Sequence, residues 1–412
     1  MNLIYNTAIG LYSLGVRIAA KRNVKACKML KGQQRTFEYL RSTLDPNSHY
    51  IWIHVSSLGE FEQARPLIER IKEDEPHRKI VLSFFSPSGY EVRKNYPNVD
   101  AVCYLPFDFK RNAREFVDLV KPEMAIFVKY EFWGNYLQEL SRREIPTYLI
   151  SAIFRPKQSF FQWWGGMFRK MLGCYTHLYV QDESSRRLLD SIEVKNVTVA
   201  GDTRFDRVTD IMKTVTELPL IERFKKGSEL TFIAGSSWSA DEDIYADWVN
   251  SHSRVKVIIA PHEFNESRLS EMRKRFNGAV LWSELLNAPE KADDAKSLII
   301  DCFGLLASIY RYGDVAYVGG GFGAGIHNVN EAAVYGMPVI FGPKYDKFKE
   351  AKDLIAMGGA FSIGSADEFT EVMNRLTRDD HRVLVAAGKT AGDYIQRSLG
   401  ATEKIYTDIF RR

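Results

Sequence analysis

The sequence predicts an α/β fold built from two doubly wound domains with parallel sheets. With 412 residues the chain is too long for one ordinary hydrophobic core, and it suits two domains of about 200 residues each. Short apolar runs typical of strands alternate with helical stretches, and no tandem repeat is present. In each half a turn of small residues follows a strand, at 56–60 and at 319–325, which is where such sheets bind ligands.

The composition is that of a folded globular protein, with 45% hydrophobic and 26% charged residues. The formal net charge of +4 is mild and does not by itself indicate nucleic-acid binding. The cysteines are widely separated, which predicts reduced core thiols in a cytoplasmic protein rather than disulfides or a metal site. They are Cys27, Cys103, Cys174 and Cys302.

The N-terminal segment 3–20 is apolar for most of its length, and a cluster of basic residues follows it at 21–31. A secretory signal carries its positive charge before the apolar run, so this order favours an uncleaved anchor over residues 1–30. Such an anchor would lie on or dip into the inner leaflet, with its basic residues facing anionic head groups. The alternative is a soluble amphipathic helix that packs on the first domain.

The first clear strand, 51–55, leads through Ser57 and Gly59 to Glu60, and a helix is expected at 61–72. Glu60 should therefore lie at the carboxyl edge of the sheet. A capping box between Ser57 and Glu60 would account for the same residues without any ligand. Further strands are expected at 79–85, 101–105, 124–127, 147–150 and 197–200, with a helix at 110–121.

A second carboxylate, Glu131, also follows a strand and precedes a helix. It could serve a site at the sheet edge, or it could be a surface glutamate that the helix dipole favours in a first turn. Arg155 follows the next strand. Aromatic and basic residues alternate at 160–170 on one expected helix, which fits either an interfacial surface or a half-buried helix.

The segment 208–228 contains Pro219 and a Lys-Lys-Gly cluster, and it is expected to be a hinge. The second alternating unit begins with strands at 230–234 and 255–260, and His262 follows the second of these. A lone histidine there is more often a structural residue than a ligand. The chain closes with helices expected at 347–357, 366–376, 380–387 and 391–410.

The glycine-rich loop after the strand 314–318 is the strongest functional signal. Glycines leave backbone N–H groups accessible, and a helix expected at 328–335 follows, so the loop is suited to bind a phosphate. His327 and Asn330 would face that phosphate, and Glu331 would accept hydrogen bonds from ribose hydroxyls.

Two other interpretations of this loop stay open. Asn328 could cap the helix and form a capping box with Glu331, which would need no ligand. A dinucleotide fingerprint can also be placed on the glycines, but the helix starts late for it and no carboxylate ends the next strand, 339–341.

The run GGGFGAGIHNVNEAAVYGMPVIFGPKYDKF resembles the nucleotide-binding signature of the 3-deoxy-D-manno-octulosonic acid (Kdo) transferases, GT-B glycosyltransferases of lipopolysaccharide assembly. HVSSLGEFEQ, KYEFWGN and GDTRFD resemble further motifs of that family, and the resemblance covers nearly the whole chain. Three places depart from the family pattern. Ile153 and Phe154 intervene before Arg155, whereas the family commonly has an arginine soon after the preceding Ser/Asn-Ala pair. SSWSADED stands where the family has a threonine, histidine and glutamate cluster, and Pro261 stands where it often has an arginine.

By this resemblance Glu60 is the general base for an acceptor hydroxyl, and Glu131 helps to position acceptor or donor. Ser57, Gly59 and Arg155 are implied in acceptor binding. The implied donor-binding residues are Arg204, His262, Gly320, Gly321, Gly323, His327, Asn328, Asn330 and Glu331.

The resemblance also implies two Rossmann-like domains that face across a cleft. The first is an acceptor domain at 31–207, followed by the hinge and a nucleotide-sugar domain at 229–390, and a C-terminal helix at 391–412 crosses back to the first domain. The expected partners are CMP-Kdo, a lipid A precursor (lipid IVA) and the cytoplasmic face of the inner membrane, without nucleic acid.

No metal or other cofactor is expected, because the glycine loop lacks a DxD-like pair. Two alternatives remain: a UDP-sugar-dependent GT-B glycosyltransferase acting on another envelope acceptor, and a non-enzymatic two-domain binding protein.

Overall fold

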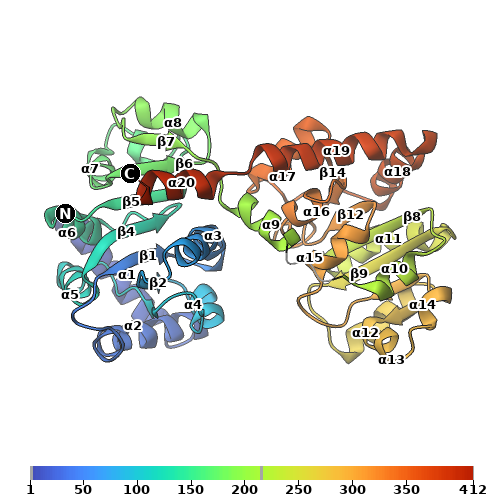
Figure 1. Cartoon of the computed structure of the whole chain (residues 1–412), viewed down its shortest axis with the longest axis horizontal. Coiled ribbons are helices and arrows are strands. Elements are labelled where there is room, and N and C mark those ends of the chain that lie inside the picture. Colours follow the sequence, from blue (N-terminus) through green and yellow to red (C-terminus); the bar gives the residue numbers. More distant parts are fainter. Residues whose placement is uncertain (1–2, 214–216, 412) are drawn as a thin grey trace. The chain divides into compact units, whose positions relative to one another are not determined.

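A computed structural model describes residues 3–213 and 217–411 of the protein. The contacts within the chain divide it into two compact units. Unit 1 contains Met1–Arg207 together with Leu399–Arg412, and unit 2 contains Val208–Ser398 (Figure 1). Both ends of the chain therefore belong to unit 1.

Unit 1 is built on a seven-stranded parallel sheet with the order β3-β2-β1-β4-β5-β6-β7. The order reverses between β1 and β4, which is the point where a doubly wound sheet binds its ligand. The strands are β1 (Tyr50–Val55), β2 (Ile80–Phe84), β3 (Ala101–Tyr104), β4 (Pro122–Val128), β5 (Thr147–Ala152), β6 (His177–Val180) and β7 (Val197–Val199).

Helices cover both faces of this sheet (Figure 1). Side chains of α2, α5, α6 and α7 form the core on one face, and those of α3 and α20 form the core on the other. The helices of unit 1 are α1 (Leu3–Ala19), α2 (Val24–Thr43), α3 (Leu58–Asp74), α4 (Pro87–Arg93), α5 (Lys110–Val120), α6 (Gly134–Arg142), η1 (Ser159–Phe161), α7 (Gly166–Leu172), α8 (Glu183–Asp190), α9 (Arg204–Lys213) and α20 (Ala401–Phe410).

Unit 2 repeats the plan with a second seven-stranded parallel sheet, ordered β10-β11-β9-β8-β12-β13-β14. Here the order reverses between β8 and β12, and the glycine loop follows β12. The strands are β8 (Leu230–Ser237), β9 (Val255–Pro261), β10 (Ala279–Leu281), β11 (Ser297–Ile299), β12 (Val315–Val318), β13 (Val339–Phe341) and β14 (Ala360–Ser362). The predicted fold class is confirmed.

The helices of unit 2 vary from a single turn to more than four turns. They are α10 (Pro219–Lys225), α11 (Ser239–Ser251), α12 (Glu266–Arg275), α13 (Trp282–Asn287), α14 (Lys291–Asp294), α15 (Leu306–Ile309), η2 (Tyr310–Tyr312), α16 (Asn330–Ala333), α17 (Lys349–Met357), α18 (Ala366–Thr377), η3 (Asp379–His381) and α19 (Arg382–Arg397).

The closing helices differ from the sequence-based expectation. The helix expected at 391–410 is two helices, because the chain turns at Gly400, whose φ is +94°. α19 runs through the expected break near 388–390 and belongs to unit 2, whereas α20 packs in unit 1. Asp206 accepts hydrogen bonds from the N–H groups of Gly400 and Thr402, both at 2.7 Å, and so fixes the start of α20.

The segment predicted as a hinge, 208–228, holds more regular structure than expected. α9 continues through its first residues to Lys213, and α10 occupies Pro219–Lys225. Residues 214–216 lie outside the described part of the chain. The boundary between the units falls after Arg207, inside α9.

The aromatic segment at 160–170 is not one helix. A turn at Gly165 separates η1 from α7. This turn requires glycine, because a Cβ at position 165 would lie 2.0 Å from the Ser159 carbonyl oxygen. Phe160 is buried, whereas Trp163 is 92% exposed. The segment therefore has features of both alternatives, the half-buried helix and the interfacial surface, because Phe160 lies in the core and Trp163 faces solvent.

The N-terminal helix α1 exposes an apolar face. Leu3, Ile4, Leu11, Leu14 and Ile18 are all more than half exposed, and the opposite side packs on unit 1. In the described part of the chain, no single helix is both long and apolar enough to cross a bilayer. α1 and α2 meet these criteria of length and composition only as a pair, bent by 120° at their junction.

Candidate functional site

Glu60 lies in the first turn of α3, directly after β1 at the reversal of strand order in unit 1. The Ser57 hydroxyl donates a hydrogen bond to the Glu60 carboxylate. Ser57 is the N-cap of α3, yet its side chain caps no backbone N–H group. The capping-box interpretation is therefore wrong, because the two side chains bind each other rather than the helix. Gly59 is exposed beside them, and a Cβ there would fit.

Glu131 is buried, with only 3% of its surface exposed, so the interpretation as a surface glutamate is wrong. One carboxylate oxygen accepts from the Ser56 hydroxyl. The other accepts from Trp133 Nε1 and lies 3.2 Å from His54 Nε2. Both oxygens are thus occupied within the protein, and Glu131 ties the end of β1 to the loop after β4.

His54 extends this network into the sheet, and sequence reasoning missed it. Its ring is fully buried, and Nδ1 lies 2.8 Å from the hydroxyl of Ser83 on β2. That hydroxyl also accepts from Trp52 Nε1 at 2.8 Å, and the Ser83 carbonyl oxygen lies 3.1 Å from His54 Nδ1. A histidine inside an otherwise apolar strand was the available signal.

Tyr130, also missed, is exposed to the charges of several predicted side chains of unit 1. Tyr130 is 39% exposed. The charges of Arg155 and Arg204 act to lower its pKa, and the charge of Glu60 acts to raise it. Burial, more than any of these charges, raises the pKa of Tyr130. Lys129 precedes it with φ of +71°, an unusual backbone conformation that turns the chain after β4. Tyr130 and the three charged residues that act on it follow four strands, β1, β4, β5 and β7, and so belong to the same carboxyl edge of the sheet.

Arg204 is held by a neighbour within unit 1. Its guanidinium donates from Nε at 3.0 Å and from Nη2 at 2.8 Å to the carboxylate of Asp202, which is 5% exposed. Gln63 donates to the same carboxylate at 3.0 Å. Burial alone would raise the pKa of Asp202, but Arg204 outweighs it and lowers that pKa. Arg155, in contrast, is exposed.

In unit 2, His262 lies between two other rings after β9. Trp238 stacks on one face with ring centroids 4.5 Å apart, and His327 stacks on the other at 4.4 Å. Burial, followed by the neighbouring His262, lowers the pKa of His327. Two predicted donor residues are therefore adjacent, and Trp238, from the segment that departs from the family pattern, covers them.

The glycine loop is more closely packed than the sequence indicated. The Gly320 N–H donates to the buried carboxylate of Asp241 at 2.9 Å, and the Gly323 N–H donates to the Gly320 carbonyl at 2.9 Å. A Cβ at Gly321 would lie 2.6 Å from the Gly342 backbone. The expectation that these N–H groups are free for a phosphate is therefore wrong for Gly320 and Gly323, whereas Gly321 is required for close packing.

The turn after this loop differs from the expected helix start. α16 spans only Asn330–Ala333, rather than 328–335. Asn328 accepts from the Asn330 N–H at 3.1 Å and donates from Nδ2 to Glu331 at 3.0 Å. Asn328 thus forms a turn before the helix and holds the Glu331 side chain. The Asn330 amide is 1% exposed, and neither its Nδ2 nor its Oδ1 has a hydrogen-bond partner among the described residues.

Comparison with known structures agrees with this fold. A UDP-GlcNAc 2-epimerase from Neisseria meningitidis, bound to UDP-GlcNAc, superposes with a TM-score of 0.58 at 14% identity. The match covers 88% of this chain and 100% of that structure. The S. aureus MnaA-UDP structure gives a TM-score of 0.57 at 12% identity, over 88% and 96% of the two chains. At these identities the likeness defines the fold class, GT-B.

Sequence comparison identifies the family within this class. Residues 31–207 match the family described as 3-deoxy-D-manno-octulosonic-acid transferase (kdotransferase). The transferase of that name from Aquifex aeolicus is 26% identical over 79% of this chain and 85% of its own length. The Haemophilus influenzae transferase is 21% identical over 87% and 86%. The resemblance to the Kdo transferases is thereby confirmed, with the family match over residues 31–207 and similarity to such transferases over most of the chain, and it indicates a glycosyltransferase.

Proposed function

We propose that this protein transfers Kdo from CMP-Kdo to a lipid A precursor, lipid IVA, with inversion at the anomeric carbon. The family relationship supports the transfer of Kdo. The observation that carries the acceptor chemistry is Glu60, a partly exposed carboxylate at the reversal of strand order in unit 1. A carboxylate in this place can remove a proton from an alcohol.

In the proposed reaction Glu60 takes the proton of the acceptor hydroxyl. The resulting oxygen attacks the anomeric carbon of Kdo and forms the new C–O bond as the bond to the CMP phosphate breaks. CMP leaves with that electron pair. The hydrogen bond from Ser57 fixes the orientation of the Glu60 carboxylate, so that less orientational freedom is lost when the acceptor binds.

Donor binding is assigned to unit 2. The buried amide of Asn330, which has no hydrogen-bond partner among the described residues, offers two donors and one acceptor to a ligand. Glu331, held by Asn328, would accept hydrogen bonds from hydroxyl groups of a ribose. The stacked rings of His262 and His327 lie next to the glycine loop, where their ring nitrogens could bind an anionic group. Arg204 would take part only if it also kept its contact with Asp202.

The transfer is proposed to require no metal ion or other cofactor. In the described residues no group of three or more metal-ligating side chains is present. The proposal is tested by turnover in EDTA, which should be unchanged. Loss of turnover in EDTA that Mg²⁺ restores would contradict it.

The protein is further proposed to act at the cytoplasmic face of the inner membrane, as a peripheral protein or through its N-terminal segment. The exposed apolar face of α1 and the exposed Trp163 support this localisation, since single apolar residues of this size favour a bilayer interface.

The function is tested by incubating the purified protein with CMP-Kdo and a tetra-acylated lipid A precursor and measuring product mass. One or more added Kdo masses are expected. A UDP-sugar-dependent enzyme would instead bind UDP in preference to CMP, which mass spectrometry of the complexes distinguishes. Absence of product with either donor would favour a binding protein.

A further inference from the structure

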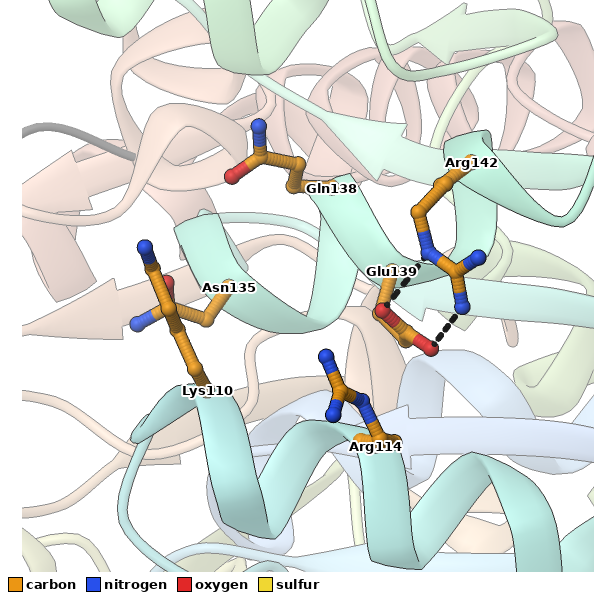
Figure 2. A pocket seen from close by; sticks show the side chains of 6 residues that line it. All are labelled: Lys110, Arg114, Asn135, Gln138, Glu139 and Arg142. Carbon is orange, nitrogen blue, oxygen red and sulfur yellow. Dashed lines mark hydrogen bonds and ion pairs between the residues drawn. The ribbon is translucent and has the colours of Figure 1, made fainter.

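A pocket lies in the groove between α5 and α6 of unit 1, apart from the residues around Glu60 (Figure 2). It has a volume of about 250 Å³. α3, which carries Glu60, packs on the opposite face of the sheet from these two helices. The lining residues are Lys110, Arg114, Asn135, Gln138, Glu139 and Arg142.

The pocket is cationic. Lys110 and Arg114 are exposed, and no ion pair or side-chain hydrogen bond is found for either among the described residues. The one carboxylate, Glu139, is bound by Arg142 and by Arg143, and hydrogen bonding to Arg142 is the main reason that its pKa falls to about 2. Glu139 is therefore ionised, and the arginines that bind it balance its negative charge. The positive charges of Lys110 and Arg114 are left to bind an anion.

A buried acceptor complements these cations. Asn135 is 3% exposed, and its Nδ2 donates to the carbonyl of Asp108 and to Asn6 Oδ1. These two bonds fix the amide, and its Oδ1 is left without a partner among the described residues. A buried carbonyl oxygen of this kind requires a donor. A ligand that suits the pocket therefore combines an anionic group with a hydroxyl.

The same end of the pocket contacts the start of α1. Asn6 binds Asn135, and the hydroxyl of Tyr5 accepts from the N–H of Gly134, the first residue of α6. The rest of α1 turns its apolar face to solvent. A cationic pocket adjoining an exposed apolar helix matches the two parts of an anionic lipid, whose charged head group is attached to apolar chains.

We propose that this pocket binds the phosphate and hydroxyl of an anionic glycerophospholipid head group, such as that of phosphatidylglycerol, while α1 lies on the bilayer. Lys110 and Arg114 would contact the phosphate, and Asn135 Oδ1 would accept from the head-group hydroxyl. The site would hold the protein on the membrane in a defined orientation. It does not depend on which sugar is transferred.

The test is flotation of the full-length protein with phosphatidylcholine vesicles that contain phosphatidylglycerol. The double variant Lys110→Gln/Arg114→Gln should bind about tenfold or more weakly, since each basic side chain near an anionic surface contributes severalfold to affinity. The matched control is Arg111→Gln/Arg187→Gln, which removes the same charge from exposed sites of unit 1 outside the pocket. It should bind within about twofold of the unchanged protein.

Equal losses in the two double variants would overturn the proposal, because the attraction would then be a property of net charge alone. A second comparison uses phosphatidylmethanol, which has the same phosphodiester charge without the hydroxyl. The protein should bind vesicles with phosphatidylmethanol more weakly than vesicles with phosphatidylglycerol. Equal binding would show that Asn135 does not recognise the head-group hydroxyl. Free glycerol phosphate at low millimolar concentration should not displace the protein from vesicles. Displacement would assign the pocket to a soluble phosphate instead.

Discussion

The hydroxyl of Ser57 donates a hydrogen bond to the carboxylate of Glu60, three residues further along α3. The adjacent Ser56 hydroxyl donates to Glu131, which is buried. Two neighbouring serines thus bind two carboxylates in different surroundings. Glu60 is partly exposed and can meet an acceptor, whereas Glu131 is enclosed by its hydrogen-bond donors. This difference predicts distinct consequences when each carboxylate is removed.

Replacement of Glu60 by glutamine should abolish turnover without loss of the fold. The amide cannot take a proton, so kcat is expected to fall about 10²- to 10⁴-fold. Product mass measured over time gives the rate, and thermal unfolding checks the fold. Glu62→Gln, on the same helix, is the control and should retain nearly full activity. A Glu60→Gln enzyme within tenfold of the original rate would exclude Glu60 as the base.

Replacement of Glu131 by alanine should act on stability. It leaves His54, Trp133 and the Ser56 hydroxyl without their shared acceptor in a buried place, at a cost of about 3–5 kcal/mol in the free energy of unfolding. Urea unfolding measures this cost. Glu123→Ala, an exposed carboxylate near the start of β4, should change stability by about 0.5 kcal/mol or less. An inactive but fully stable Glu131→Ala protein would instead assign Glu131 a direct role in the reaction.

The Asp202–Arg204 pair predicts a pH dependence. Arg204 lowers the folded-state pKa of Asp202, so the pair contributes stability above the unfolded pKa of about 4, which is lost as the pH falls through the folded pKa. Arg204→Gln leaves a buried carboxylate unpaired, and burial then raises its pKa. The difference in unfolding free energy between the two proteins should therefore be largest near pH 7 and shrink toward pH 4. A difference that is constant with pH would contradict this account.

His327 should titrate below the ordinary histidine range, because burial and then the nearby His262 lower its pKa. Since the folded state resists protonation, stability linked to His327 is present above pH about 6.5 and declines as the pH falls through that value. NMR titration of the ring carbons measures the pKa directly. His262→Gln should raise the pKa of His327. An unchanged pKa would show that His262 does not contribute to the lowering.

Two glycines of the same loop should respond differently to alanine. A Cβ at Gly321 would lie 2.6 Å from the Gly342 backbone, whereas at Gly323 its nearest contact is at 3.5 Å. Gly321→Ala should lower stability by about 1–3 kcal/mol, as overpacking does. Gly323→Ala should stay within about 0.5 kcal/mol. Similar urea midpoints for the two variants would contradict the described path of the loop.

Local sequence determined the strands and the loops that follow them, but not every helix. The alternation of strand-like and helical segments was sufficient for two doubly wound sheets, because the period of apolar residues records which face is buried. The placement of Glu60, Glu131 and His262 just after strands followed in the same way, since parallel strands end at a common edge.

The partners of these side chains were decided only by the tertiary structure. Whether Glu131 is exposed depends on His54 and Trp133, and whether the Gly320 N–H is free depends on Asp241, 79 residues earlier in the chain. Such contacts join residues far apart in the sequence, and no local pattern encodes which donor meets which acceptor. The sequence alone therefore determined which side chains follow the strands at the sheet edges, while packing decided which of these groups remain accessible to a ligand.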